Sequence, residues 1–301
     1  MRLIILICLL SPGVLSGQRL DSLVIDSLTG KRMMAYELKD QWLYYPKPKH
    51  FGFLTKAPRT FRDVAVESFS RKSLPAWGAI AGTTAIFLMF DQQMLDGVQQ
   101  FSRFINVDNT SIYHPVLDFN IGSQGVLIYR APGNLNTFLY QLGEGIPPLL
   151  ISAGLLTYGW IKNDYRARST ASQVAQVILT MGLTTQTLKR ISGRESPFVA
   201  TADGGVWRPL PSLRTYQHNV SHYDAFPSGH MATMMACLIV FADNYPEKRW
   251  IRPIGYTIMA LSGLAMMNTN VHWASDYPLA IGLGYVFGKA TVKMNRWVKG
   301  K

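Results

Sequence analysis

Six apolar segments, each about four to five helical turns long, set the strongest limit on how this chain can fold. Most are somewhat shorter than the roughly 20 residues that a bilayer-spanning helix needs, although flanking residues can extend them. We therefore expect an all-α fold, a bundle of about five to six apolar helices that is integral to a membrane. The segments are residues 74–90, 146–161, 170–188, 230–243, 253–267 and 277–292.

Composition restricts the class of protein further. The 301 residues are 48% hydrophobic and 16% charged, with a net charge of +12 at pH 7. The basic residues stand at the ends of the apolar segments and form no arginine-rich or aromatic-interleaved stripe, so we expect no nucleic-acid partner. Cys8 and Cys237 are the only cysteines, and Cys8 falls in the N-terminal apolar run, so no disulfide framework is expected.

The first 73 residues differ in character from the rest. Residues 1–17 combine Arg2, a short apolar core and small residues, which is the pattern of a cleaved secretory signal peptide. Residues 18–73 mix charges, prolines and aromatic residues without a helical period, so we expect a loosely ordered or surface-hugging, exported N-terminal segment. Residues 91–145 are expected to form a short amphipathic helix and loops. The remaining domain, residues 74–301, is the expected helical bundle.

Lysine and arginine clusters follow the second, fourth and sixth apolar segments. Cytoplasmic loops of membrane proteins carry an excess of these residues, so the clusters place the opposite ends of the helices in the periplasm. A cleaved signal peptide would leave residue 18 outside, and a spanning segment 74–90 would then reverse this orientation. Either 74–90 does not span the membrane or the N-terminus is not exported. The clusters are Lys162, Arg166 and Arg168; Lys248, Arg249 and Arg252; and Lys289, Lys293, Arg296, Lys299 and Lys301.

Three short motifs stand at the edges of apolar segments on the predicted periplasmic side. Residues 189–197 read Lys-Arg-Ile-Ser-Gly-Arg-Glu-Ser-Pro, residues 227–230 read Pro-Ser-Gly-His, and His272 precedes Asp276 by four residues. In a helix this spacing puts both side chains on one face. A histidine attacks phosphorus when it is neutral, and a carboxylate on its other ring nitrogen fixes the tautomer and stabilises the cation that forms.

The Pro-Ser-Gly-His motif adds the remaining groups that phosphoryl transfer needs. His230 can protonate a departing oxygen, and Ser228 offers a hydroxyl donor. Gly229 lets a backbone N–H approach phosphate at the start of a helix, where the dipole favours an anion. Alone, this motif is more typical of a turn followed by a helix cap, and Lys189 of the basic flank of a membrane helix. The three motifs together favour a phosphoryl-transfer site that uses no metal.

The motifs resemble those of the type 2 phosphatidic acid phosphatase superfamily, in its membrane lipid-phosphatase branch. That family's pattern is Lys-x6-Arg-Pro, Pro-Ser-Gly-His and Ser-Arg-x5-His-x3-Asp. The second part is complete here, whereas Ser196 and Met266 replace the two phosphate-binding arginines and Ala265 replaces the serine. The similarity in order and spacing extends over residues 74–295 and implies the helical bundle of that family.

The resemblance also implies a role for each matching residue. The catalytic candidates are His272, the nucleophile that becomes phosphohistidine; Asp276, its orienting partner; and His230, the acid for the leaving group and later the base for water. The expected substrate-binding residues are Lys189, Arg194, Ser228 and Gly229. Arg194 is the first candidate to replace a missing arginine and Arg190 the second. The resemblance implies no metal and no cofactor.

The sequence thus predicts hydrolysis of a phosphomonoester or diphosphate on a lipid, at the periplasmic face of a bacterial inner membrane. Phosphatidic acid, phosphatidylglycerol phosphate, undecaprenyl diphosphate and lipid A phosphate are the candidate substrates that the resemblance suggests. A competing hypothesis is a degenerate member that binds a phosphorylated lipid head group without turnover. A soluble periplasmic bundle and a haloperoxidase are weaker alternatives, and the oligomeric state stays open.

Overall fold

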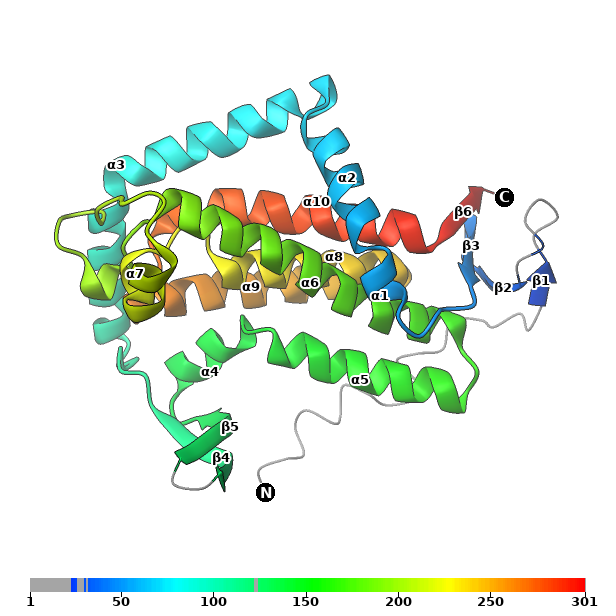
Figure 1. Cartoon of the computed structure of the whole chain (residues 1–301), viewed down its shortest axis with the longest axis horizontal. Coiled ribbons are helices and arrows are strands. Elements are labelled where there is room, and N and C mark those ends of the chain that lie inside the picture. The colour runs from blue at the N-terminus through cyan, green and yellow to red at the C-terminus, as the bar shows by residue number, and fades with distance from the viewer. Residues whose placement is uncertain (1–22, 26–29, 31, 122–123, 301) are drawn as a thin grey trace.

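The computed structural model describes residues 23–25, 30, 32–121 and 124–300, so the predicted signal peptide, residues 1–17, lies outside the described residues. The described chain is mostly helical, as the sequence predicts, and each of the six apolar segments lies in a helix (Figure 1). The six helices are α3 (Leu74–Phe104), α5 (Ile146–Ile161), α6 (Tyr165–Ser192), α8 (Gly229–Asn244), α9 (Ile251–Asn268) and α10 (Tyr277–Asn295).

Helix α8 occupies the centre of the bundle, because its sequence is apolar around most of its circumference. It packs against α6, α9 and α10, and Gly284 and Gly288 allow α10 to approach closely, since a Cβ at either glycine would lie within 3 Å of α8 atoms. The core formed in this way includes Val174, Val177, Met181, Ala232, Ala236, Ile239, Met266 and Phe287.

Residues 32–73 form strands and helices that contact the bundle, and not a loosely ordered segment. Strands β1 (Leu23–Ile25), β2 (Arg32–Glu37), β3 (Gln41–Pro46) and β6 (Trp297–Gly300) form one antiparallel sheet in the order β1-β2-β3-β6. The Tyr36 hydroxyl donates to Asp164 Oδ1 at 2.7 Å, and the Tyr45 hydroxyl donates to Asn244 Oδ1 at 2.9 Å. The sheet is therefore fixed to the turns after α5 and α8, and aromatic side chains without a helical period were the signal for it.

Two helices connect this sheet to α3. They are α1 (Gly52–Thr55) and α2 (Ala57–Ser68), followed by the 3-10 turn η3 (Arg71–Ser73). Helix α2 buries Thr60 and Val64 against the bundle, and Gln176 of α6 donates to the Thr60 hydroxyl at 2.8 Å. Helix α3 then crosses the bundle toward the end that lies opposite the sheet (Figure 1).

Residues 91–145 contain more regular structure than the sequence predicts. Helix α3 continues through Asp91 and Asp96 to Phe104, and it is followed by a hairpin of β4 (Tyr113–Ile121) and β5 (Gln124–Pro132) and by α4 (Leu135–Leu142). Asn134 caps α4 by accepting from the Thr137 N–H at 2.8 Å. The expected short amphipathic helix corresponds to α4, but the expectation of loops for the rest of this region is wrong. Helix α3 does not end at its first carboxylate, because Asp91 has a buried partner.

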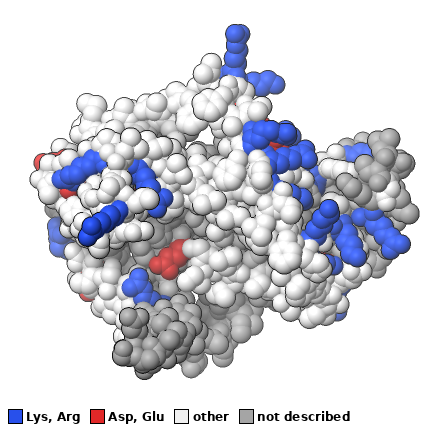
Figure 2. Space-filling view, in the orientation of Figure 1, with Lys and Arg blue, Asp and Glu red and all other residues white. Residues whose placement is uncertain are grey.

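The bundle has two chemically different ends. One carries the sheet and the turns after α5, α8 and α10, and Lys and Arg side chains gather over it (Figure 2). The other carries α7 (Leu213–His218), the 3-10 turns η4 (Pro197–Val199), η5 (Val220–His222) and η6 (Ala274–Asp276), and a smaller basic group. Within the described residues, the helical stretch Arg71–Phe104 is long and apolar enough to cross a membrane, and none of its apolar window is buried.

Candidate active site

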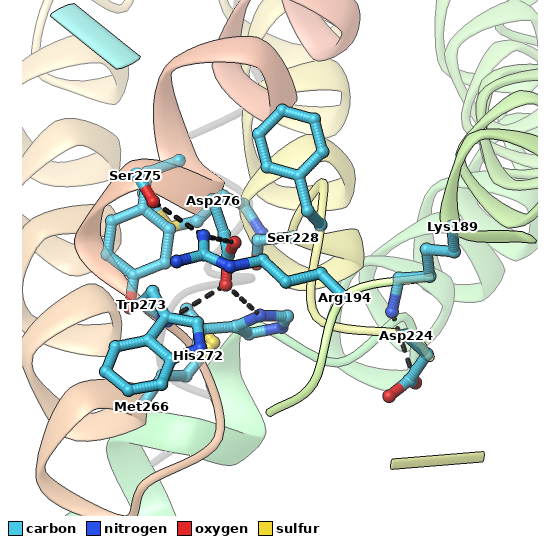
Figure 3. A network of polar contacts seen from close by, with 12 residues as sticks. Lys189, Arg194, Asp224, Ser228, Met266, His272, Trp273, Ser275 and Asp276 are labelled. Carbon is cyan, nitrogen blue, oxygen red and sulfur yellow. Dashed lines mark hydrogen bonds and ion pairs between the residues drawn. The ribbon is translucent and has the colours of Figure 1, made fainter. Parts of the chain in front are cut away.

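The three sequence motifs converge at the end of the bundle that lies opposite the sheet. His272 Nδ1 lies 3.2 Å from Asp276 Oδ2, and the ring of His230 lies 6.0 Å from that of His272, centroid to centroid. His272 itself is not helical, and the short turn η6 brings Asp276 back to it. The predicted pairing is therefore present, although a 3-10 turn and not the face of an α-helix produces it (Figure 3).

Asp276 is completely buried, and every contact of its carboxylate favours the charged form. Oδ2 accepts from the Trp273 N–H at 2.9 Å, and Oδ1 accepts from Arg194 Nη1 at 2.6 Å. Burial raises the pKa of Asp276, but the Arg194 charge and the hydrogen bond to His272 outweigh that effect and hold the pKa below its usual range. The ionised carboxylate keeps the proton of His272 on Nδ1, so that Nε2 is left as the free, nucleophilic nitrogen.

Arg194 occupies a different place from the one expected of a phosphate ligand. Gly193 ends α6 with φ +59°, where a Cβ would lie 1.9 Å from the Arg208 carbonyl oxygen, and this turn directs Arg194 into the interior. Its guanidinium is fully buried and lies 5.0 Å from the Trp207 ring and 5.4 Å from the Trp273 ring. Its hydrogen-bond partners are Asp91, Asp276, the Ser275 hydroxyl and the Gly204 carbonyl.

These five hydrogen bonds equal the number of N–H donors on a guanidinium. Arg194 therefore has no donor left for a substrate phosphate, and the prediction that it replaces a missing arginine as a phosphate ligand is wrong. The motif spacing placed a cation near the site, but it did not show which way the Arg194 guanidinium points. Arg190 lies over the ring of Tyr216 in α7, 4.7 Å from its centroid.

Lys189 stands beside the start of α8, as a phosphate ligand would. A Cβ on Gly229 would lie 3.8 Å from Lys189 Nζ, so the ammonium group and the Gly229 backbone face the same space. Lys189 Nζ is also 3.4 Å from Asp224 Oδ2, an ion pair that sequence analysis missed (Figure 3). Any phosphate bound here would share this lysine with a carboxylate.

Ser228 links the Pro-Ser-Gly-His motif both to α8 and to Asp276. Its side chain caps the helix by accepting from the Met231 N–H at 3.4 Å, and its N–H donates to the Asp276 carbonyl at 3.0 Å. Within the described residues the Ser228 hydroxyl donates no hydrogen bond, and the residue is completely buried. His230 follows on the first turn of α8 and stacks on Tyr140 of α4 at 4.6 Å. The absence of a side chain at Gly143 lets α4 cover His230, because a Cβ there would lie 3.2 Å from that of His230.

The two positions at which the family has arginine are both buried. The Ser196 N–H donates to the Ser221 carbonyl at 2.9 Å, and the side chain is 3% exposed. Met266 is fully buried in the core cluster, and its carbonyl accepts from the Val271 N–H at 2.8 Å, just before His272. The structure thus fills both positions with uncharged groups.

Glu195 holds the loop that follows it, residues 196–208, through hydrogen bonds of its side chain. Its buried carboxylate accepts from Arg208, from the N–H and hydroxyl of Thr201 and from the Val206 N–H at 3.0 Å. Burial raises the pKa of Glu195, but these hydrogen bonds outweigh burial and lower it to about 2. The Glu195 carbonyl also accepts from Trp273 Nε1 at 2.9 Å, which connects this loop to the residue after His272.

Asp91 is a residue of the candidate site that no sequence motif contains. It lies 1% exposed on α3, pairs with Arg194 Nη2 at 2.7 Å, and accepts from both the N–H and the hydroxyl of Ser275. A single carboxylate in the middle of an apolar helix signals a buried partner. Within the described residues, no group of three or more His, Cys, Asp or Glu side chains is placed to hold a metal ion.

The arrangement is a buried histidine and carboxylate pair that faces a second histidine, a lysine and a helix N-terminus. Residues 171–299, which contain all three motifs, match the family described as the PAP2 superfamily. This match agrees with the resemblance of the three motifs to that superfamily.

Two known proteins are also similar to this chain, one in sequence over a short stretch and one in structure. A stretch of 67 residues is 34% identical to the Lipid A 1-phosphatase of Porphyromonas gingivalis and covers 22% of this chain but only 15% of that relative. A solved structure, the first transmembrane PAP2 type phosphatidylglycerolphosphate phosphatase from Bacillus subtilis, matches with a TM-score of 0.36 and 14% identity over 80% of this chain and 94% of that chain. The similarity to the PAP2 superfamily model is confined to residues 171–299.

Proposed function

We propose that this protein hydrolyses a phosphomonoester or diphosphate on a lipid through a phosphohistidine intermediate. The observation that carries the proposal is the His272 and Asp276 pair at 3.2 Å, with His230 across from it at 6.0 Å between ring centroids. The two histidines are neighbours, so one can act as the nucleophile and the other as the acid on the same phosphate group.

The steps follow from the positions of these groups. His272 Nε2 attacks phosphorus while Asp276 accepts the hydrogen bond from Nδ1–H and stabilises the cation that develops. The bond from phosphorus to the lipid oxygen breaks, and His230 gives that oxygen a proton. His230 then takes a proton from water, the resulting hydroxide attacks the phosphohistidine, and phosphate leaves. Lys189, the Ser228 hydroxyl and the Gly229 N–H hold the phosphate oxygens.

Exposed apolar side chains support a lipid as the substrate. They include Ile86, Met89 and Phe90 on α3, Leu149, Leu150 and Trp160 on α5, and Ile254, Leu261 and Leu264 on α9. Exposed apolar area of this extent is typical of a surface that contacts lipid or another protein. The name of the relative from Porphyromonas gingivalis points in the same direction. The four lipids that the motif resemblance suggests therefore remain the substrates to test.

A second function, binding of a phosphorylated head group without turnover, is favoured by one set of observations. Ser196 and Met266 are uncharged and buried, Arg194 has no free donor, and Lys189 is shared with Asp224. Charge-assisted contacts are about twice as strong as neutral ones, so two missing arginines would cost on the order of 10²-fold in rate. We place the enzyme first because a binder has no need of an oriented nucleophile and a second histidine.

The two functions are separated by measuring phosphate release and lipid binding on the same purified protein. We expect release from at least one of the four lipids, and we expect Lys189→Ala to lower kcat/KM by about 10-fold to 100-fold through loss of a charged phosphate contact. Ser196→Arg should leave release equal or raise it. Binding that Lys189→Ala weakens, with no release from any of the four lipids, would establish the binding protein instead.

We also propose that the bundle spans the inner membrane with the site facing the periplasm. The sheet lies at the end of the bundle opposite the site, together with Lys248, Arg249 and Arg252, so in a spanning bundle its residues 32–46 lie on the cytoplasmic side. An exported N-terminal segment and a periplasmic site are then mutually exclusive. The position of the sheet favours the alternative in which the N-terminus is not exported and α3 spans the membrane.

This topology predicts opposite labelling of two exposed positions. The background for both variants is Cys8→Ser/Cys237→Ala, and the membrane-impermeant thiol reagent is added to cells from which the outer membrane has been stripped. Asp203→Cys, in the loop after η4, should react with this reagent. Asp40→Cys, in the turn between β2 and β3, should react only after lysis. The reverse pattern would invert the orientation, and labelling of both positions before lysis would show that the bundle does not separate two compartments.

A further inference from the structure

One buried carboxylate of α3 belongs to the site although no motif contains it. Asp91 is 1% exposed, and Arg194, its partner, is completely buried. Asp91 Oδ2 accepts from Arg194 Nη2 at 2.7 Å, and Arg194 Nη1 donates to Asp276 Oδ1 at 2.6 Å. Asp276 Oδ2 in turn lies 3.2 Å from His272 Nδ1. A continuous series of contacts thus joins α3 to the proposed nucleophile.

A second contact ties Asp91 to the turn that carries Asp276. Asp91 Oδ1 accepts from the Ser275 N–H at 3.0 Å, and Oδ2 accepts from the Ser275 hydroxyl. Ser275 directly precedes Asp276 in the turn η6, so Asp91 holds both the backbone before this carboxylate and the cation beside it. We propose that Asp91 is a positioning residue, which fixes Asp276 through Arg194 and Ser275 and thereby orients His272; the inference rests on the proposed function.

The balance of charge explains why a carboxylate is needed at this place. Arg194 lies between Asp91 and Asp276, so the three groups carry a net charge of −1. With a neutral residue at position 91, Arg194 would be balanced by Asp276 alone, and the net charge beside His272 would be zero. Asp276 would then stabilise a positive His272 less well.

Three other ionisable groups lie near this network, and none of them connects Asp91 to His272. His230 of α8 and Tyr277 of α10 lie 6.0 Å and 6.3 Å from the His272 ring, and Lys189 of α6 stands near His230. None of them contacts Asp91 through a hydrogen bond or an ion pair in the described residues. A change at Asp91 therefore reaches His272 through Arg194, Ser275 and Asp276.

The test compares Asp91→Asn with Asp96→Asn, which removes an exposed carboxylate five residues later on the same helix. In Asp91→Asn we expect kcat to fall more than KM rises, because Asp91 does not touch the substrate. We expect the acid limb of the kcat/KM profile to move to lower pH by about one unit. Asp96→Asn should retain the wild-type profile. In Asp91→Asn/Arg194→Gln, where the net charge returns to −1, the limb should return to its wild-type position.

The same variants give a readout that does not need turnover. With ¹⁵N-labelled histidine, the ring nitrogen signals that disappear in His272→Ala can be followed against pH, and their midpoint should move as the acid limb does. That shift would stand even if the protein released no phosphate, so failure of the proposed function is distinguishable from failure of this inference. An unmoved limb and midpoint would overturn it. So would loss of folded Asp91→Asn protein while the double variant folds, because Asp91 would then have a structural role alone.

Discussion

Replacing His272 with alanine should abolish phosphate release from every lipid substrate, with a loss in kcat of at least about a thousandfold. The reason is that His230, the histidine beside His272, has no carboxylate partner among the described residues. His222 has one, Glu195 at 3.3 Å, but it lies in the turn η5 and its side chain is 37% exposed. The fold should persist, because Asp276 keeps its hydrogen bonds from Arg194 and the Trp273 N–H when the imidazole is removed. Initial rates of phosphate release, measured on protein recovered from the membrane fraction, test this expectation.

His50→Ala is the matched control for that experiment. His50 is exposed and lies between β3 of the sheet and α1, so its loss should leave turnover unchanged. Turnover by His272→Ala at the level of the His50→Ala protein would remove the phosphohistidine mechanism.

The second large effect concerns Arg194, and it is an effect on folding. Arg194→Ala would leave Asp91 and Asp276 buried without a cation, and removing one partner of a buried charge network typically costs about 3–5 kcal/mol of stability. We expect a corresponding fall in the free energy of unfolding, followed by denaturant titration of the purified protein. Phosphate release should fall as well, because Asp276 would no longer be held beside His272.

Arg208→Ala provides the comparison, since Arg208 also pairs with a buried carboxylate. Its guanidinium is 39% exposed, and Glu195 would keep its hydrogen bonds from Thr201 and the Val206 N–H, so the loss of stability should be much smaller. Equal stabilities for the two variants, with a loss of phosphate affinity in Arg194→Ala alone, would contradict the structural role and restore Arg194 as a phosphate ligand.

The sequence predicted the six helices well because each contains a long apolar run, and the ends of α6 and α8 also carry caps. Asp164 starts α6, Ser228 starts α8, and Gly193 ends α6, all residue types that favour these positions. The N-terminal strands were missed because their burial depends on contacts distant in sequence, such as the hydrogen bond from Tyr45 to Asn244. Such contacts leave no periodic signal in the strand itself.

The candidate site was predictable where its parts are local. His272 and Asp276 are close in sequence, and Ser228, Gly229 and His230 are adjacent. Arg194 was correctly placed near the site but wrongly assigned to phosphate, because motif spacing does not include the carboxylates that come from elsewhere. The missing information was Asp91, 103 positions away, whose charge decides where the guanidinium points.

The most direct test of the account is chemical quenching of the wild-type protein during turnover of a radiolabelled phosphorylated lipid. Phosphohistidine is stable to alkali and labile to acid, so we expect an alkali-stable, acid-labile label on the peptide that contains His272. The label should be absent from His272→Ala and present in His50→Ala. Phosphate release by wild-type protein without any label on that peptide, or a label that persists in His272→Ala, would contradict the central claim that His272 is the nucleophile.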